Sequence, residues 1–347
     1  MSHRIAFAGL GCALAVTFLA DLALGSVTIP PAGVFAALTG GEPADPVWTR
    51  IVLSLRLPRA LTASLAGAAL AVSGLQMQTL FRNPLAGPFV LGVNAGASLG
   101  VALVVLATGG LGGAWLLSSV EVASDVGTVA AAMAGAAAVM LLVVAMARRV
   151  QSVVTLLVLG LLIGYAASAA VSLLMHFSAA DRIQAYVVWT FGSFGSVGWS
   201  RLAILAPAVA AGLLLSGVMV KPLNAMLLGE KQAVALGVRT RQTRTLLVGS
   251  SALLAGAVTA FCGPVTFIGV AVPHLARSAL RSADHRVLLP AVALLGALVA
   301  LLADIVSGVP GADLRLPLNA VTSLLGAPVV AAAVLRSRHL GGRGGEP

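Results

Sequence analysis

The sequence predicts an all-α, polytopic membrane protein with about ten transmembrane helices. Of its 347 residues, 59% are hydrophobic and only 9% are charged, and the mean hydropathy is +1.04. A soluble domain carries about 25% charged residues, so a soluble core could not hide this much apolar surface. A membrane β-barrel would show alternating segments of roughly ten residues. Here the apolar runs are long and continuous, which favours helices.

Most of the predicted spans are apolar runs of the length that a bilayer requires, roughly 20 residues. The spans lie near 5–25, 57–81, 86–107, 127–147, 153–176, 200–220, 243–262, 264–281, 286–308 and 316–336. The first run could instead be a signal peptide, with small residues for cleavage at 20–25. We favour an uncleaved span, because the rest of the chain has the same composition.

Two segments depart from this pattern. The eighth run is short and is interrupted by Pro273 and His274, so it need not cross the bilayer. The segment 184–197 is too short to cross and is expected to form an interfacial or re-entrant helix. Trp189 and Trp199 would then lie at headgroup depth, where tryptophan is enriched.

The basic residues predict the orientation. With the N-terminus inside, 15 Lys and Arg residues fall inside and 6 fall outside, which accounts for all 21. This bias follows the positive-inside rule and places both termini in the cytoplasm. It also explains the net charge of +10 without a nucleic-acid partner. We therefore predict one membrane domain over 1–340, with a cytoplasmic loop at 221–244 long enough for two short helices, and a cytoplasmic tail at 341–347.

Small residues mark one predicted helix face. Gly92, Gly96 and Gly100 recur every four residues, which lets a neighbouring backbone approach closely. Cys12 and Cys262 both lie in apolar runs and are interpreted as small buried hydrophobic residues, not as a disulfide or a metal pair. We expect no metal or cofactor on this chain.

The chain carries no motif for bond chemistry. It has no Walker A loop, whose backbone amides would bind phosphate, so any ATP must be hydrolysed by a partner. A proton-coupled carrier usually places ionisable residues in its spans. Only Asp21 and Asp304 are candidates, and Asp304 is the better proton relay. The simpler alternative is a structural role, in which neighbouring helix backbone or water near the outer surface forms hydrogen bonds with the Asp304 carboxyl.

Several motifs resemble one family. They are Arg56-Leu57-Pro58-Arg59, Gly74, Gln78, Arg82-Asn83-Pro84-Leu85-Ala86, the Trp189-to-Trp199 segment, Cys262-Gly263-Pro264 through Pro273-His274 to Arg277, Asp284-His285-Arg286 and Leu325-Gly326-Ala327-Pro328. Together they resemble the permease of type II ABC importers, the FecCD family, over about residues 50–336. Two positions depart from the family pattern: Gly87 replaces the usual Asp, and Arg315-Leu316-Pro317-Leu318-Asn319 replaces Glu-Leu-Pro-x-Gly.

The resemblance implies an ATP-driven importer of the bacterial inner membrane rather than an enzyme. It implies a homodimer whose interface is the translocation path, two ABC ATPase subunits inside and a periplasmic substrate-binding protein outside. Members of the family carry haem, iron-siderophores or cobalamin. We expect haem first, because apolar spans with few charges suit a flat hydrophobic ligand, then ferric siderophores, then cobalamin. A proton-coupled secondary carrier that uses Asp304 is the alternative from another class.

The resemblance also assigns roles at the two membrane surfaces. Glu230, Ala233, Leu236 and Gly237 match the coupling helix that docks on the ATPase, although a solvated connector would also explain this loop. Arg56 and Arg59, extended by Arg315, would pair with acids of the binding protein. Arginines at a helix start could equally anchor to lipid headgroups.

The gate and the cargo contact are further expectations. The family's cytoplasmic gate corresponds to Asn83, Leu85 and Ser152, which would lie near the dimer axis below a cavity lined by the second, fifth and tenth spans. The arginines in these turns could instead be peripheral topology signals. Met175 or His176, at the outer end of the fifth span, could ligate haem iron, although a hydrogen-bonded surface histidine is the simpler interpretation. His274 is expected to be structural.

Overall fold

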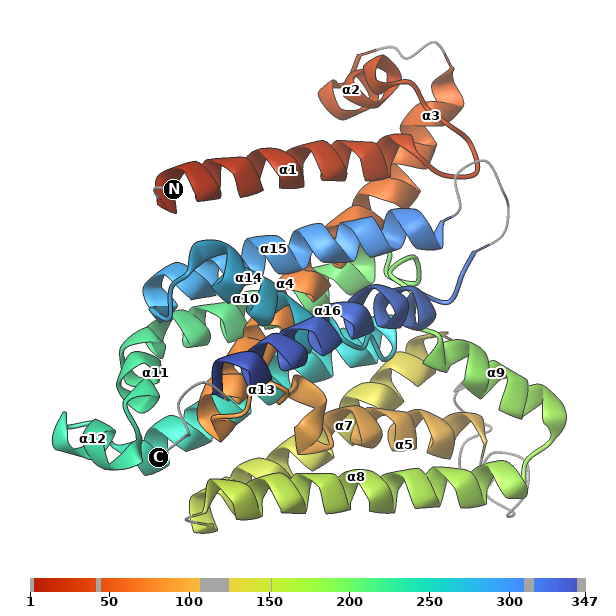
Figure 1. Ribbon diagram of the computed structural model, residues 1–347. Coiled ribbons are helices and arrows are strands. Elements are labelled where there is room, and N and C mark those ends of the chain that lie inside the picture. Colours follow the sequence, from red (N-terminus) through yellow and green to blue (C-terminus); the bar gives the residue numbers. More distant parts are fainter. Residues whose placement is uncertain (1–2, 42–44, 107–124, 151, 309–314, 342–347) are drawn as a thin grey trace.

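The computed structural model describes residues 3–41, 45–106, 125–150, 152–308 and 315–341, and these residues form helices and no strands. The helices are α1 (His3–Ala23), α2 (Pro31–Thr39), α3 (Pro46–Arg50), η1 (Ile51–Arg56), α4 (Leu57–Phe81), η2 (Pro88–Leu91), α5 (Val93–Val105), α7 (Asp125–Arg149), α8 (Val153–His176), α9 (Ala180–Thr190), α10 (Trp199–Val218), α11 (Val220–Leu227), α12 (Glu230–Ala235), α13 (Thr240–Cys262), α14 (Ile268–Leu280), α15 (His285–Ser307) and α16 (Leu318–Gly341). The all-α membrane fold is confirmed (Figure 1).

Every predicted span contains a helix. Within the described residues, seven helices are long and apolar enough to cross a membrane, and α5 and residues Leu318–Ala332 of α16 are shorter apolar helices. Helix α14 lies in the eighth predicted run. The 13 residues of α14 rise about 20 Å, less than the roughly 30 Å of a hydrocarbon core, so this helix does not reach across by itself. The third run is interrupted, because Gly92 adopts a left-handed conformation between η2 and α5.

The loops hold more helix than their composition indicates. The outer segment between the first two spans contains α2 and α3, and the π-helical turn η1 joins α3 to α4 without a break. Helix α9 begins at Ala180 and ends at Thr190, earlier than the predicted 184–197, because Gly192 turns the chain with a positive φ. Two short helices, α11 and α12, occupy the loop at 221–244.

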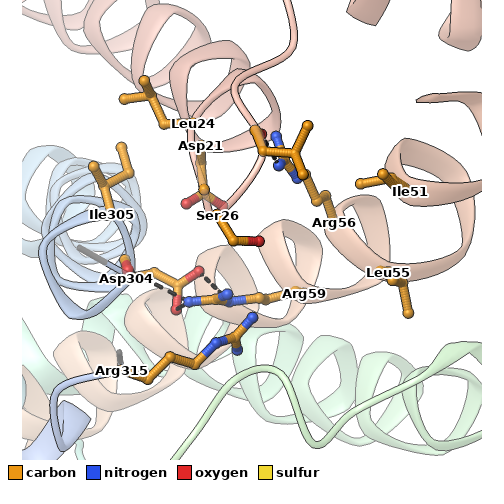
Figure 2. Close-up of a pocket in the computed structure, with 13 residues that line it drawn as sticks. Asp21, Leu24, Ser26, Ile51, Leu55, Arg56, Arg59, Asp304, Ile305 and Arg315 are labelled. Carbon is orange, nitrogen blue, oxygen red and sulfur yellow. Dashed lines mark hydrogen bonds and ion pairs between the residues drawn. The ribbon is translucent and has the colours of Figure 1, made fainter. Parts of the chain in front are cut away.

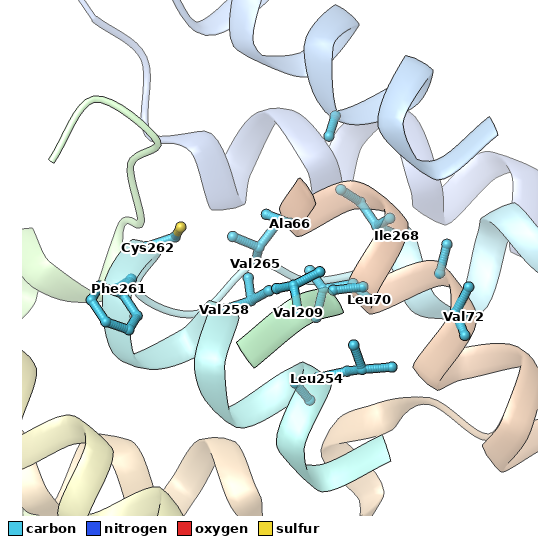
Figure 3. Packing of buried hydrophobic residues seen from close by; sticks show 14 of the residues in the cluster. Ala66, Leu70, Val72, Val209, Leu254, Val258, Phe261, Cys262, Val265 and Ile268 are labelled. Carbon is cyan, nitrogen blue, oxygen red and sulfur yellow. The ribbon is translucent and has the colours of Figure 1, made fainter. Parts of the chain in front are cut away.

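Helix α4 lies at the centre of the molecule. It packs against α15, α13, α14 and α10, which surround it on most of its length (Figure 1). The side chains in these contacts are small or branched. Figure 3 shows Leu70 of α4 beside Val209 of α10 and Val258 of α13. The core therefore runs along α4, with the other spans arranged around it.

The predicted glycine stripe packs against another helix. Gly96 and Gly100 of α5 face Gly135 and Ala131 of α7, and a Cβ added at Gly100 would overlap the carbonyl oxygen of Ala131. The expectation of a close backbone approach is therefore confirmed for Gly96 and Gly100. Gly92 precedes α5 with a left-handed φ and faces Gly160 of α8 instead. Helices α5 and α7 form a pair that packs on α13 and α8, as the lower half of Figure 1 shows.

The two ends of the bundle differ. We use "inner end" for the end that holds the C-terminus of α4 together with α11 and α12, following the predicted orientation. The "outer end" holds the N-terminus of α4, with α2, α3 and α9 (Figure 1).

Candidate functional site

The inner-end loop divides into a buried and an exposed face. Ala233 of α12 is fully buried within its own chain, whereas Leu236 is 63% exposed. Leu228 and Val234 are also exposed, so this loop has an exposed apolar surface. Of the residues predicted to meet an ATPase, Leu236 lies on the open face and Ala233 packs inward. Gly237 follows α12 with a positive φ that turns the chain toward α13.

Glu230 begins α12 and forms an ion pair. One carboxylate oxygen lies 2.8 Å from Nη2 of Arg244, on the first turns of α13. The Glu230 side chain is 51% exposed and that of Arg244 only 5%. Nη1 of Arg244 donates to the carbonyl oxygen of Val150, 2.9 Å away. Arg244 therefore links the short helix α12 to the turn between α7 and α8.

The two turns predicted to form a gate lie at this same end. Asn83 accepts the backbone N–H of Leu85 at 2.9 Å, which closes a local turn after Arg82. Ser152 is the N-cap of α8 and accepts from the N–H of Thr155 at 3.3 Å. All three predicted gate residues, Asn83, Leu85 and Ser152, are exposed. Their place relative to a dimer axis stays a prediction, since it concerns a second copy.

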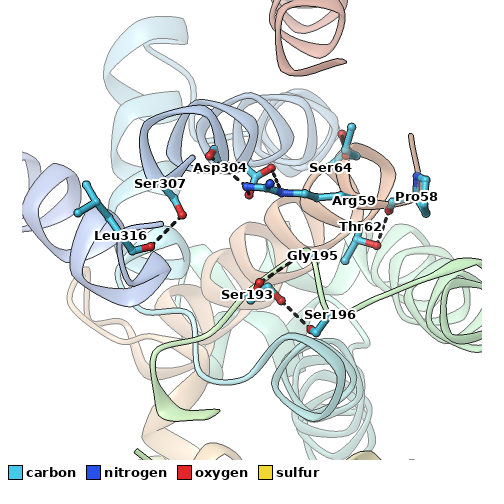
Figure 4. A network of polar contacts seen from close by, with 11 residues as sticks. Pro58, Arg59, Thr62, Ser64, Ser193, Gly195, Ser196, Asp304, Ser307 and Leu316 are labelled. Carbon is cyan, nitrogen blue, oxygen red and sulfur yellow. Dashed lines mark hydrogen bonds and ion pairs between the residues drawn. The ribbon is translucent and has the colours of Figure 1, made fainter. Parts of the chain in front are cut away.

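At the outer end, charged residues from four helices converge on a cavity of about 360 Å³ (Figure 2). Asp21 comes from α1, Arg56 and Arg59 come from η1 and the start of α4, and Asp304 comes from α15. Nε and Nη2 of Arg59 lie 2.7 Å from the two carboxylate oxygens of Asp304. This bidentate pair ties α4 to α15 across 245 positions of sequence (Figure 4).

The other two arginines of this cavity are placed differently. Arg56 donates to the backbone carbonyls of Leu22 and Val27, which fixes the chain after α1. Arg315 is exposed, and the pKa of its guanidinium is lowered by partial burial and by the nearby charge of Arg59. An arginine remains cationic at neutral pH even so. Of the three residues predicted to dock a binding protein, Arg315 is therefore the most open.

Asp304 is not placed as a solitary relay. Its side chain is 3% exposed and it is held by Arg59, with the carboxyl of Asp21 close by. Sequence reasoning considered Asp21 and Asp304 separately and missed this cluster. The only signal was that both acids, and the two arginines at 56 and 59, fall at the same end of predicted spans.

Helix α8 exposes an apolar face along its length. Val154, Val158, Leu162, Tyr165 and Leu173 are all at least 47% exposed, and no charged residue occurs between Val153 and Met175.

Met175 and His176, at the outer end of α8, do not converge on one point. Met175 packs on the core, while His176 is exposed and lies edge-to-face with Phe177 at 4.9 Å. Among the described residues, no group of three His, Cys, Asp or Glu side chains could hold a metal ion.

The chain is similar to known transport proteins over nearly its whole length. Residues 13–336 match the model of the FecCD transport family. The chain is 37% identical to the uncharacterized ABC transporter permease protein YvrB of Bacillus subtilis, over 95% of this chain and 93% of that protein. It is 36% identical to the hemin transport system permease protein HmuU of Yersinia pestis, over 92% and 94%. It is 38% identical to the vitamin B12 import system permease protein BtuC of Citrobacter koseri, over 83% and 84%.

One solved structure is similar across the fold. It is an inward-facing conformation of an ABC transporter assigned to the metal-chelate type, with a TM-score of 0.80 and 30% sequence identity. The match covers 96% of this chain and 99% of the other.

Proposed function

This chain belongs to the FecCD transport family and is a membrane permease of an ABC importer, and we propose that its cargo is haem. We further propose that two copies enclose the path, that two ATPase subunits dock on α12, and that a substrate-binding protein docks at the outer end. The permease performs no bond chemistry; it offers a cavity to each side of the membrane in turn.

The observation that carries the haem proposal is the exposed face of α8. This face carries no Asp, Glu, Lys or Arg over more than five turns, and its one histidine, His176, lies at the outer end. Haem is a wide, flat and largely apolar molecule. It can move along a wall without charges, because no ionised side chain of the wall has to lose its water as the haem passes. His176 is exposed where a cargo would enter and can act as a transient iron ligand. The similarity to the hemin permease over nearly the full length supports the same cargo.

The path is expected between two copies, beside α8 and α16. The body of α4 is buried within one protomer. Of the second span, we therefore expect only the two ends to line the path. A cysteine at Asn83, in a chain whose native cysteines have been replaced, should crosslink between protomers and block transport. Failure to crosslink in every nucleotide state would count against the turn at 82–85 as the gate.

The alternative of a proton-coupled carrier finds little support. Asp304, its best relay, is engaged with Arg59 at the outer end and does not lie halfway along a path. Cobalamin stays a second candidate cargo because of the similarity to vitamin B12 permeases.

Uptake by proteoliposomes tests the proposal. The permease is reconstituted with the ATPase that co-purifies with it and is offered haem, a ferric hydroxamate siderophore or cyanocobalamin. We expect haem to accumulate only with ATP and to accumulate more slowly in His176→Ala. Uptake of cobalamin but not haem would overturn the cargo. Uptake driven by a proton gradient without ATP would overturn the importer mechanism.

A further inference from the structure

A cavity of about 390 Å³ at the inner end is lined mainly by arginines. Arg148 and Arg149 are the last residues of α7, and Arg241 and Arg244 lie in the first turns of α13. Glu230 of α12 is the one carboxylate among the lining residues, so four positive charges and one negative charge leave a net charge of +3. Like charges held this close repel one another, and an anion between them lowers that energy.

Two of these arginines have fixed positions in the wall. Nε of Arg241 donates to the carbonyl oxygen of Arg148 at 2.8 Å. Arg244 donates to the carbonyl oxygen of Val150 at 2.9 Å and to the carboxylate of Glu230 at 2.8 Å. The carboxylate of the cavity is therefore already engaged, and the positive charge is in excess.

Arg148 and Arg149 are the arginines that can still bind a ligand. Both are exposed, and within the described part of the chain neither guanidinium has a hydrogen-bond or ion-pair partner. The first turn of α13 adds backbone donors, because its N-cap residue, Arg239, forms no side-chain hydrogen bond there. Guanidinium groups bind the oxygens of a phosphate through paired hydrogen bonds, so this donor set suits a phosphate.

The cavity also adjoins an apolar surface of α7. Leu141 and Leu142 lie seven residues before Arg148 and Arg149, and they are 65% and 47% exposed. A spacing of seven residues returns to nearly the same face of a helix, so the leucines lie below the arginines. Basic pockets at the cytoplasmic ends of spans bind anionic lipid headgroups. A phosphate at the arginines and an acyl chain along the leucines together make a phospholipid.

We infer that this cavity binds the phosphate of an anionic phospholipid from the inner leaflet. Arg148 and Arg149 hold the phosphate oxygens, and Leu141 and Leu142 contact an acyl chain. A choline headgroup is disfavoured, because its cation meets an excess of positive charge. A free phosphate ion offers the same oxygens but makes no contact with the leucines. The inference holds for any cargo, so it stands apart from the proposed function.

The first test uses the purified full-length permease in detergent and measures bound lipid by native mass spectrometry. Phosphatidylglycerol and phosphatidylcholine with identical acyl chains are titrated separately. Wild type should prefer phosphatidylglycerol. In the double variant Arg148→Gln with Arg149→Gln, its affinity for phosphatidylglycerol should fall by about thirtyfold, a factor of about five for each arginine near an anionic lipid. Its affinity for phosphatidylcholine should change little.

The matched control is Arg4→Gln with Arg286→Gln. It removes the same charge from two exposed arginines that do not line the cavity, so phosphatidylglycerol should bind as in wild type. Glu230→Gln tests the opposite direction, because it removes the carboxylate of the cavity and should strengthen binding severalfold. Equal affinity for phosphatidylglycerol in wild type and the Arg148/Arg149 variant would overturn the site. An equal loss in the control variant would overturn it as well.

The second test separates a lipid from a soluble anion. Inorganic phosphate is titrated into lipid-depleted wild type by calorimetry, with chloride at the same ionic strength as the reference. We expect no binding at concentrations at which phosphatidylglycerol saturates the protein. Tight binding of phosphate, without a preference for phosphatidylglycerol over phosphatidylcholine, would overturn the lipid as the ligand. Unchanged lipid binding with loss of the co-purifying ATPase in the Arg148/Arg149 variant would assign the cavity to that partner instead.

Discussion

Two helices of nearly equal length, α4 and α8, occupy opposite environments. A stretch of 18 residues in the span that contains α4 has a mean hydropathy of 1.4, and 83% of that stretch is buried inside the protein. The corresponding stretch of α8 has a mean hydropathy of 2.2, and 17% of it is buried. The less hydrophobic helix is thus the interior one. In a bilayer, lipid solvates apolar side chains as well as protein does. Residues in the protein interior are therefore those that allow close packing and interhelical hydrogen bonds.

The polar residues of α4 show what this interior requires. Ser73 bonds to Ser251 of α13, and Nε2 of Gln76 donates to Ser216 of α10 at 2.7 Å. In α8, by contrast, Ser172 bonds only to the carbonyl of Ser168 in its own helix. Ser73 and Gln76 of α4 therefore join helices, whereas the hydrogen bond of Ser172 stays within α8. Four comparisons between variants can break or sharpen this contrast.

The largest effect is expected from the ion pair at the start of α4. Arg59→Leu leaves the carboxylate of Asp304, which is 3% exposed, without its partner. Removal of one member of a buried pair costs about 3–5 kcal/mol, whereas replacement of both by apolar residues is often neutral. Thermal unfolding in detergent should show a large loss for Arg59→Leu and recovery in Arg59→Leu with Asp304→Leu. His176→Leu on α8, where the side chain is exposed, should change little.

The next effect concerns packing. A Cβ added at Gly74 of α4 would overlap the carbonyl oxygen of Gly269, so Gly74→Ala must push α14 away. Overpacking of this kind costs about 1–3 kcal/mol. Gly164 of α8 is the matched control, because its nearest neighbour, Cα of Gly92, lies 4.0 Å from the added Cβ. If Gly164→Ala destabilised the protein as strongly as Gly74→Ala, the distinction between the two helices would fail.

A smaller effect is expected from the hydrogen bonds. Gln76→Leu removes the donor to Ser216 and Ser250, which keep their bonds to the carbonyl of Gly212. Interhelical hydrogen bonds in membrane proteins contribute roughly 0.6 kcal/mol on average. A shift of this order in the unfolding free energy is expected for Gln76→Leu, and none for Ser172→Ala in α8. Indistinguishable shifts for the two variants would contradict an interhelical role.

The smallest effect concerns Asp284, the N-cap of α15. The next residue, His285, contacts Thr79 near the inner end of α4. The N–H of Arg286 and the amide of Asn224 lower the pKa of the exposed Asp284 carboxyl below its usual 3.8. A lowered pKa means stability that is present above 3.8 and lost as pH falls through the folded value. The melting temperatures of wild type and Asp284→Asn should therefore converge in acid. The Ser152 cap of α8 has no charge to lose, so Ser152→Ala should lower the melting temperature equally at neutral pH and in acid.

Much of the fold could be predicted from the sequence, because span length and the glycine stripe are local patterns. The predicted runs match α4, α8 and α15 within a residue or two. Which span is central could not be read from hydropathy, since the span that contains α4 is the most buried of the seven candidate spans in the described residues and has the lowest hydropathy. The pairing of Arg59 with Asp304 depends on tertiary packing over 245 positions. The inward face of Ala233 depends likewise on how α12 rests on α13, which no periodicity in six residues can specify.

The apolar face of α8 has a consequence for assembly in the cell. Lipid solvates Leu162 and Val158 as well as another protein surface can, so no release of ordered water draws a second chain onto this face. A second copy that packs near this face must therefore displace acyl chains by closer packing. Pairing then depends on the number of copies per unit area of membrane. Reconstitution at a high ratio of lipid to protein should therefore separate protomers that stay paired when they share one small detergent micelle.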